Sequence, residues 1–161
     1  MNWKDIQAYG RVYSMEHLRP FSQGFEVDDR LVTIHFTFGF HCFTDDKGNG
    51  PLQFYKGERR YFCSMRYECS TQLSSWIDKR LLDCQVRLIT DKSRGRRYFC
   101  MDLHDYAIFF DIRKPQDTEN ELKLHVISAY EVDNWGRPHL PKGKQHNLSW
   151  VIGMRAQGIS V

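Results

Sequence analysis

Two histidines that could do proton chemistry lie on one segment, residues 31–44, which reads LVTIHFTFGFHCFT. Apolar and polar residues alternate along it, as in a β-strand with one buried and one open face. The open face is expected to carry His35 and His41, with Gly39 leaving room for a substrate. Strand rise places the two imidazoles roughly 20 Å apart, too far to act as a pair. His41 is therefore a candidate general acid or base that needs other partners.

The buried side of this segment is expected to seed the core. Because neighbouring residues on a strand point to opposite faces, Cys42 cannot form a nucleophile pair with His41, and its predicted role is packing. The expected buried row consists of Val32, Ile34, Phe36, Phe38, Phe40 and Cys42.

A third histidine, His125, lies on a predicted strand over residues 121–132. The alternation of that strand puts Ser128 and Tyr130 on the face opposite His125, so a Ser–His dyad within this strand is not expected. For His35 and His41 the alternative to a catalytic role is a side chain on a solvated or helix-covered sheet face, hydrogen-bonded to a neighbour.

Cations mixed with aromatic residues predict binding of an anionic partner. Arg60 and Arg66 carry guanidinium groups that can hold a phosphate at two points, and Tyr67 can stack on a base. A solvated, salt-bridged helix face is the alternative. Two basic segments extend this set of candidate RNA-binding residues, with Arg94 and Arg97 in a turn and Arg137, Lys142 and Lys144 in a loop.

The elements that must position these residues follow from hydrophobic periodicity. Apolar residues at spacings of three and four predict a main helix over residues 64–82. Period-two segments predict a four-stranded antiparallel meander over 84–90, 96–103, 106–113 and 121–132. A short helix over residues 3–9, a strand within 52–62 and a last strand over 148–155 complete the prediction. The expected fold is α+β, a single domain over residues 1–161 with an antiparallel sheet packed against one main helix.

Composition narrows the function classes. The net charge of +3 permits an anionic partner without requiring one. Five cysteines without a CxxC pair indicate reduced thiols, and the absence of a secretory signal or a membrane-length apolar run favours the cytoplasm. No Walker loop, GxGxxG, HExxH, EF-hand or GxSxG motif occurs, which argues against a nucleoside-triphosphate enzyme, a zinc protease and an α/β-hydrolase. No cofactor or metal is expected.

The order of helix and meander, with the strands YAIFFDI and LKLHVISAYE, resembles the barnase/EndoU/RelE-like ribonuclease superfamily over about residues 60–132. This resemblance implies metal-independent RNA cleavage, with His41 or His125 as acid or base, Arg66 as phosphate binder and Tyr130 positioning the substrate. The segments FGFHCFTDD and RRYFCSMRYECS also resemble short bacterial mobile-element proteins described as growth-adaptation proteins.

Two functions are therefore expected. The first is a toxin-like or prophage-type ribonuclease, in which a base, an acid and a cation promote attack of a 2′-hydroxyl on the adjacent phosphate. The second is a non-catalytic module that binds RNA or a protein, such as an immunity, antitoxin or phage-defence component.

Overall fold

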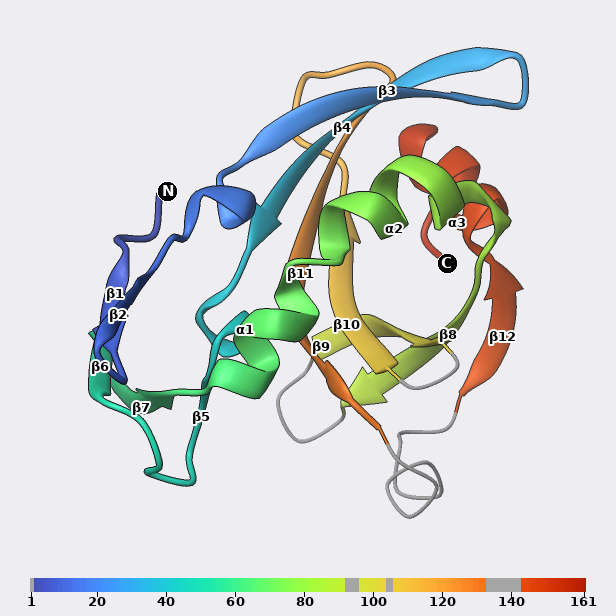
Figure 1. Ribbon diagram of the computed structural model, residues 1–161. Helices are drawn as coiled ribbons and strands as arrows, with labels where there is room; N and C mark the ends of the chain where they lie inside the picture. The colour runs from blue at the N-terminus through green and yellow to red at the C-terminus, as the bar shows by residue number, and fades with distance from the viewer. Residues whose placement is uncertain (1, 92–95, 104–105, 133–142) are drawn as a thin grey trace.

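The computed structural model describes residues 2–91, 96–103, 106–132 and 143–161 and has an α+β fold built on a curved sheet (Figure 1). The sheet has seven strands in the order β12-β8-β9-β10-β11-β4-β3. Their bounds are β3 Phe21–Val27, β4 Arg30–Phe38, β8 Gln85–Asp91, β9 Arg96–Leu103, β10 Tyr106–Arg113, β11 Glu121–Glu131 and β12 Lys144–Asn147. The predicted four-stranded meander is confirmed as β8 to β11.

The prediction of a purely antiparallel sheet is wrong. Strand β4 pairs in parallel with β11, and His125 lies opposite Thr37 in that register. Strand β3 then pairs with β4 in the antiparallel direction. Because β4 joins the sheet across more than 80 residues of chain, local periodicity carries no signal for this pairing.

The predicted main helix is confirmed with a break at Thr71 and Gln72. It consists of α1 (Ser64–Ser70), α2 (Leu73–Arg80) and a 3₁₀ turn, η3 (Leu81–Asp83). The sheet curves around α2 and the C-terminal helix α3 (Leu148–Ala156) in Figure 1, and buried side chains of both helices join those of β4 in one core. This face of the sheet is called the helix face, and the opposite face the open face.

The last predicted strand, over residues 148–155, is wrong. These residues form helix α3 (Leu148–Ala156). Leu148 and Ile152 fit an alternating pattern, but they also stand four residues apart, and Val151 completes one buried helical stripe with them. Burial against the core, which the short pattern cannot reveal, decides between the two periods.

The N-terminal residues form hairpins that cover one end of the core. The predicted helix over residues 3–9 is wrong, because Tyr9 and Gly10 adopt positive φ angles of 52° and 73° and reverse the chain.

The predicted strand within 52–62 is confirmed and belongs to a separate three-stranded sheet. The bounds here are β1 Ile6–Ala8, β2 Arg11–Tyr13, η1 Glu16–Leu18, β5 Thr44–Asp45, β6 Leu52–Tyr55 and β7 Glu58–Phe62.

Strand β4 ends at Phe38, so the predicted strand over 31–44 is too long. The backbone N–H of Gly39 donates to the carbonyl of Val126 at 2.8 Å, and the chain then turns through a 3₁₀ segment, η2 (Phe40–Cys42). The predicted buried row is nevertheless confirmed in full, because η2 folds its apolar side chains back onto the core. His41 therefore lies on a turn and not on the strand that carries His35.

A β-bulge at Ile127 changes which side chains of β11 share a face. Phe109 of β10 lies opposite Ser128, whereas Phe110 lies opposite Val126. The extra residue shifts the buried row from Val126 to Ala129, so Ser128 and Tyr130 lie on the open face with His125. The prediction that they occupy the opposite face is wrong, because it assumed an unbroken alternation.

Replacing Gly50 with alanine is expected to destabilise the fold. A Cβ atom at Gly50 would overlap the carbonyl oxygen of Phe62, which is backbone and cannot rotate away. We expect a loss of about 1–3 kcal/mol in the free energy of unfolding, and a fall in Tm of about 2–4 °C for each kcal/mol. The matched control is Gly24→Ala, whose nearest neighbour is the exposed side chain of Leu31. Thermal denaturation checks both, and equal Tm values would contradict this packing.

Candidate functional site

Two adjoining cavities lie on the open face of the sheet. The first has a volume of about 380 Å³ and is lined in part by His41, Glu58 and Tyr55. The second has a volume of about 400 Å³ and is lined by His35, Thr37, Asp111, Arg113, Lys123 and His125. Thr37 and His125 line both cavities. The two cavities therefore adjoin at these residues, and together we call them the histidine groove.

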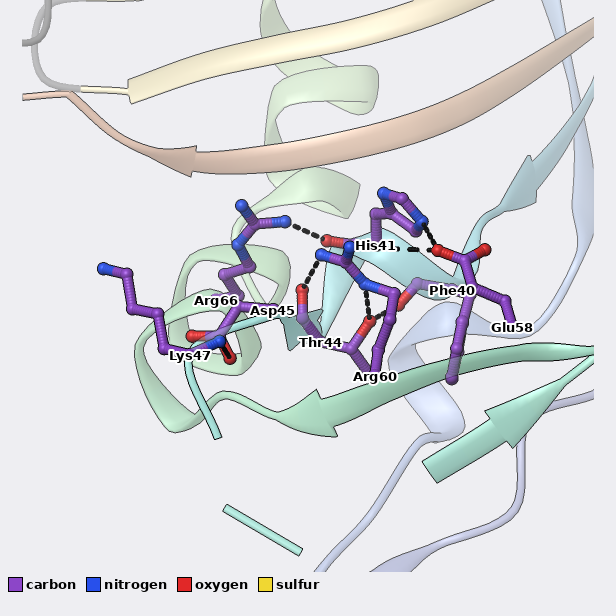
Figure 2. A network of polar contacts seen from close by, with 8 residues as sticks. All are labelled: Phe40, His41, Thr44, Asp45, Lys47, Glu58, Arg60 and Arg66. Carbon is purple, nitrogen blue, oxygen red and sulfur yellow. Dashed lines mark hydrogen bonds and ion pairs between the residues drawn. The ribbon is translucent and has the colours of Figure 1, made fainter. Parts of the chain in front are cut away.

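His41 is held by a carboxylate from another element. Its Nε2 lies 2.6 Å from Oε1 of Glu58, which opens strand β7 (Figure 2). This contact orients the ring and leaves Nδ1 to exchange a proton with a ligand. Burial lowers the pKa of His41 below its ordinary value of 6.5, and the guanidinium groups of Arg60 and Arg66 lower it further, whereas Glu58 opposes the shift. At neutral pH the His41 imidazole is therefore mainly an uncharged base.

Two arginines fix the turn that presents His41. Arg66 of α1 donates from Nη1 to the carbonyl of His41 at 2.9 Å. Arg60 of β7 donates to the hydroxyl and the carbonyl of Thr44, each at 2.9 Å. The Thr44 hydroxyl in turn donates to the carbonyl of Phe40 at 2.6 Å, as Figure 2 shows. The backbone around His41 is thus tied on both sides by side-chain hydrogen bonds.

His125 lies where the two cavities meet. Its Nδ1 is 2.7 Å from the hydroxyl of Thr37 on the neighbouring strand β4. Its Nε2 is the other proton-exchanging atom, and it lies against Gly39, where an added Cβ would approach to 3.1 Å. Burial lowers the pKa of His125 below 6.5, with Asp111 opposing the shift and Arg113 adding to it. The absence of a Cβ at Gly39 therefore makes room for the imidazole, which lines the first cavity.

His35 also lines the groove, but its two nitrogens are occupied. Nδ1 lies 2.6 Å from the hydroxyl of Ser22, and Nε2 lies 3.0 Å from Oε1 of Glu121. The alternative interpretation made for the histidines, a side chain satisfied by its neighbours on an exposed face, describes His35 well. It describes His41 and His125 less well, because each keeps one ring nitrogen without a hydrogen bond to any described residue.

Tyr130 and Arg66 form a contact at the edge of this region. The Arg66 guanidinium lies 5.0 Å from the centre of the Tyr130 ring, and Tyr130 stacks on Phe109 with ring centres 5.5 Å apart. Burial raises the pKa of Tyr130, and Arg66 opposes the shift, so the phenol is a hydrogen-bond donor at neutral pH. Neither residue is among those that line the two cavities, so Arg66 acts on the site through the His41 carbonyl.

The structure brings two of the four predicted catalytic residues to one cavity, places the other two beside it, and separates the predicted binding residues. His41 and His125 line one cavity, and Arg66 contacts both Tyr130 and the His41 backbone. Lys144 lies on the edge strand β12 and Arg97 on β9, both away from β11 in the strand order. Tyr67 packs against the N-terminal hairpin and donates to the carbonyl of Ser14. The predicted binding residues Arg94, Arg137 and Lys142 lie outside the described residues.

Five groove residues have no role in the predicted site. Period-two alternation places Thr37 on the same face as His35 and His41, and Lys123 on the same face as His125, but it does not distinguish them from other exposed residues. Asp111 and Arg113 alternate on β10 in the same way. Glu58 carries no local signal, because only the packing of β7 against η2 brings it to His41.

Besides the contact between His35 and Ser22, the fold contains a second Ser–His contact, which supports the fold. His17 Nε2 lies 2.7 Å from the hydroxyl of Ser70, which donates to the carbonyl of Tyr67 at 2.6 Å. Ser70 is 1% exposed, so no substrate can reach it. This contact ties η1 to α1 and is not a nucleophile site.

Among the described residues, no group of three or more His, Cys, Asp or Glu side chains has the arrangement of a metal site. The helices that these residues form are all too short or too polar to cross a bilayer.

Comparison with known proteins identifies a family. The family model of the YjaZ family matches residues 5–154, which is most of the chain, so the protein belongs to that family. Searches of the curated proteins and of the solved structures found no match. The resemblance to small ribonucleases and to mobile-element proteins stays a prediction.

Proposed function

We propose that this member of the YjaZ family cleaves RNA phosphodiester bonds by metal-independent general acid–base catalysis in the histidine groove. One observation carries the proposal: two imidazoles from different elements line one cavity, and each keeps one ring nitrogen for proton exchange. A matched acid and base of this kind is what cleavage next to a 2′-hydroxyl requires. A toxin-like role in a bacterial cytoplasm, and a cognate protein partner, stay predictions.

The proposed reaction is an internal transesterification. His41 Nδ1 accepts the proton of the 2′-hydroxyl while that oxygen attacks phosphorus. The bond between phosphorus and the 5′-oxygen of the next nucleotide breaks, and protonated His125 Nε2 donates its proton to that oxygen. The products are a 2′,3′-cyclic phosphate and a free 5′-hydroxyl. Glu58 stabilises the imidazolium that forms on His41, as a carboxylate does beside a catalytic base.

Charge on the phosphate is expected to be stabilised by cations near the cavity. Lys56 lines the first cavity, with its Nζ 5.3 Å from the centre of the Tyr55 ring, and is the cation proposed to stabilise the developing charge there. Arg66 was predicted for this role, and its contacts favour a positioning role instead, because it holds the His41 carbonyl and the face of Tyr130.

The pH dependence follows from the two lowered pKa values. The reaction needs one neutral and one protonated imidazole, so its rate is largest between the pKa values of His41 and His125. Both pKa values lie below 6.5, so the maximum of kcat/KM is expected below pH 6.5. Above it the rate falls, because the acid loses its proton. Initial rates between about pH 5 and about pH 8 test this, and a maximum above pH 7 would contradict it.

The direct experiment is cleavage of a labelled RNA by the purified protein in excess EDTA. The expected result is strand scission that leaves 2′,3′-cyclic phosphate ends, whereas DNA of the same sequence stays intact because it lacks the attacking hydroxyl. RNA that stays intact with the wild-type protein across that pH range would end the proposal.

A non-catalytic RNA-binding module is the second candidate. One observation favours it: Arg60 and Arg66 use guanidinium donors within the protein, which leaves fewer donors for a transition state. This candidate predicts salt-sensitive RNA binding without strand scission in the same assay.

A further inference from the structure

The open face places two rows of side chains across three neighbouring strands. Thr37 of β4, His125 of β11 and Asp111 of β10 lie opposite one another in the first row. The second row lies two residues away from the first on each strand and consists of His35, Lys123 and Arg113. Side chains two residues apart on one face of a strand stand about 6.8 Å apart. That step is close to the spacing of consecutive phosphates in a nucleic-acid strand.

The second row supplies cations that the rest of the protein leaves accessible. Lys123 and Arg113 are both exposed, and neither makes an ion pair or a side-chain hydrogen bond within the described residues. Arg60 differs, because its side chain is only 13% exposed and binds Thr44. The groove therefore offers two cations one side-chain step from His125.

Asp111 restricts which anion can bind beside these cations. Its carboxylate lines the second cavity together with Arg113 and Lys123, and it repels a ligand that offers only negative charge. A ribonucleotide offers a hydroxyl donor as well as a phosphate, so it can satisfy the carboxylate and the cations together. Deoxyribose lacks that 2′-hydroxyl donor.

We propose that the second cavity is a subsite for single-stranded RNA, in which Lys123 and Arg113 bind the phosphate next to the scissile one and Asp111 accepts a hydrogen bond from a ribose hydroxyl. This subsite rests on the proposed function, because only the proposed cleavage reaction defines which phosphate is scissile. A single strand fits because its bases can turn away from the sheet, whereas a paired helix holds its backbone in fixed geometry.

The test measures binding of a fluorescein-labelled 12-nucleotide single-stranded RNA by anisotropy. The His41→Ala background prevents cleavage during the measurement. We expect Lys123→Gln with Arg113→Gln to weaken binding and to reduce the slope of log K against log salt by about 0.7 for each lost phosphate contact. Asp111→Asn is expected to reduce the preference for RNA over DNA of the same sequence.

The matched control is Lys79→Gln with Arg80→Gln, which removes the same charge from the exposed end of α2. Thermal denaturation shows that each variant is folded. Equal loss of binding in both double variants would overturn the subsite, because it would reflect net charge alone. Binding of a 12-base-pair RNA duplex as tight as that of the single strand would also overturn it.

Failure of this subsite and failure of the proposed function give different results. If the wild-type protein cleaves RNA but the groove variant binds like the control variant, the subsite is wrong and the catalytic proposal stands. If the groove variant loses binding but the wild-type protein never cleaves RNA, the subsite stands as part of a non-catalytic RNA-binding protein.

Discussion

His41→Ala is expected to slow RNA cleavage in EDTA by about 10²–10⁴-fold, the range that removal of a general base typically costs. The substitution removes the only atom proposed to accept the 2′-hydroxyl proton and leaves Glu58 paired with Arg60 alone, at 3.8 Å. Binding of RNA should change little, because the cations of the groove remain. Single-turnover cleavage of a labelled RNA measures the rate, and anisotropy measures the binding.

The control for this variant is His146→Ala. His146 lies on β12 and stacks on Trp150, away from both cavities, and its loss should leave the cleavage rate unchanged. Parallel purification of the two variants also controls for contaminating nucleases. If His41→Ala cleaves as fast as His146→Ala, His41 is not the base.

His125→Asn is expected to reduce kcat by a similar factor of about 10²–10⁴, because the leaving 5′-oxygen loses its proton donor. Asparagine can keep a hydrogen bond to the Thr37 hydroxyl, so the β4–β11 contact should survive. The fall in rate above the pH maximum, which reports the loss of the His125 proton, should disappear from the pH profile. The two substitutions together are expected to cost little more than either alone, since acid and base act as a unit.

An RNA whose leaving group needs no protonation separates this role from a structural one. A substrate with a 4-nitrophenolate leaving group should be cleaved by His125→Asn almost as fast as by the wild type. A variant equally slow on both substrates would show that His125 supports the fold of the groove and not proton transfer.

Much of the fold could be predicted from local patterns because the core is amphipathic along each element. Val32, Ile34 and Phe36 alternate on β4, and Leu73, Trp76 and Ile77 follow the helical period on α2. The parallel pairing of β4 with β11 could not be predicted, because it joins residues distant in the sequence. Helix α3 was misjudged because Leu148 and Ile152 satisfy both periods.

Local sequence patterns predict less of the candidate site than of the fold. His41 and His125 were identified by residue type on expected open faces, and the structure brings them to one cavity. Their closeness depends on the turn at Gly39, which takes His41 off the strand. The bulge at Ile127 places Tyr130 on the face that strict alternation denied it. A one-residue insertion in a strand reverses every later side chain, so a period-two argument cannot pass through it.

The proton-exchanging groove is tested most directly by NMR of the imidazole C–H signals. The ligand is a dinucleotide whose first sugar is 2′-deoxy, so that it cannot be cleaved, and whose second sugar is ribose, so that it keeps the hydroxyl proposed to bind Asp111. The signals of His41 and His125, assigned from the single variants, should titrate below pH 6.5 and shift together as the dinucleotide is added, while the signals of His146 stay in place. Signals of His41 and His125 that ignore the dinucleotide would contradict a shared phosphodiester site.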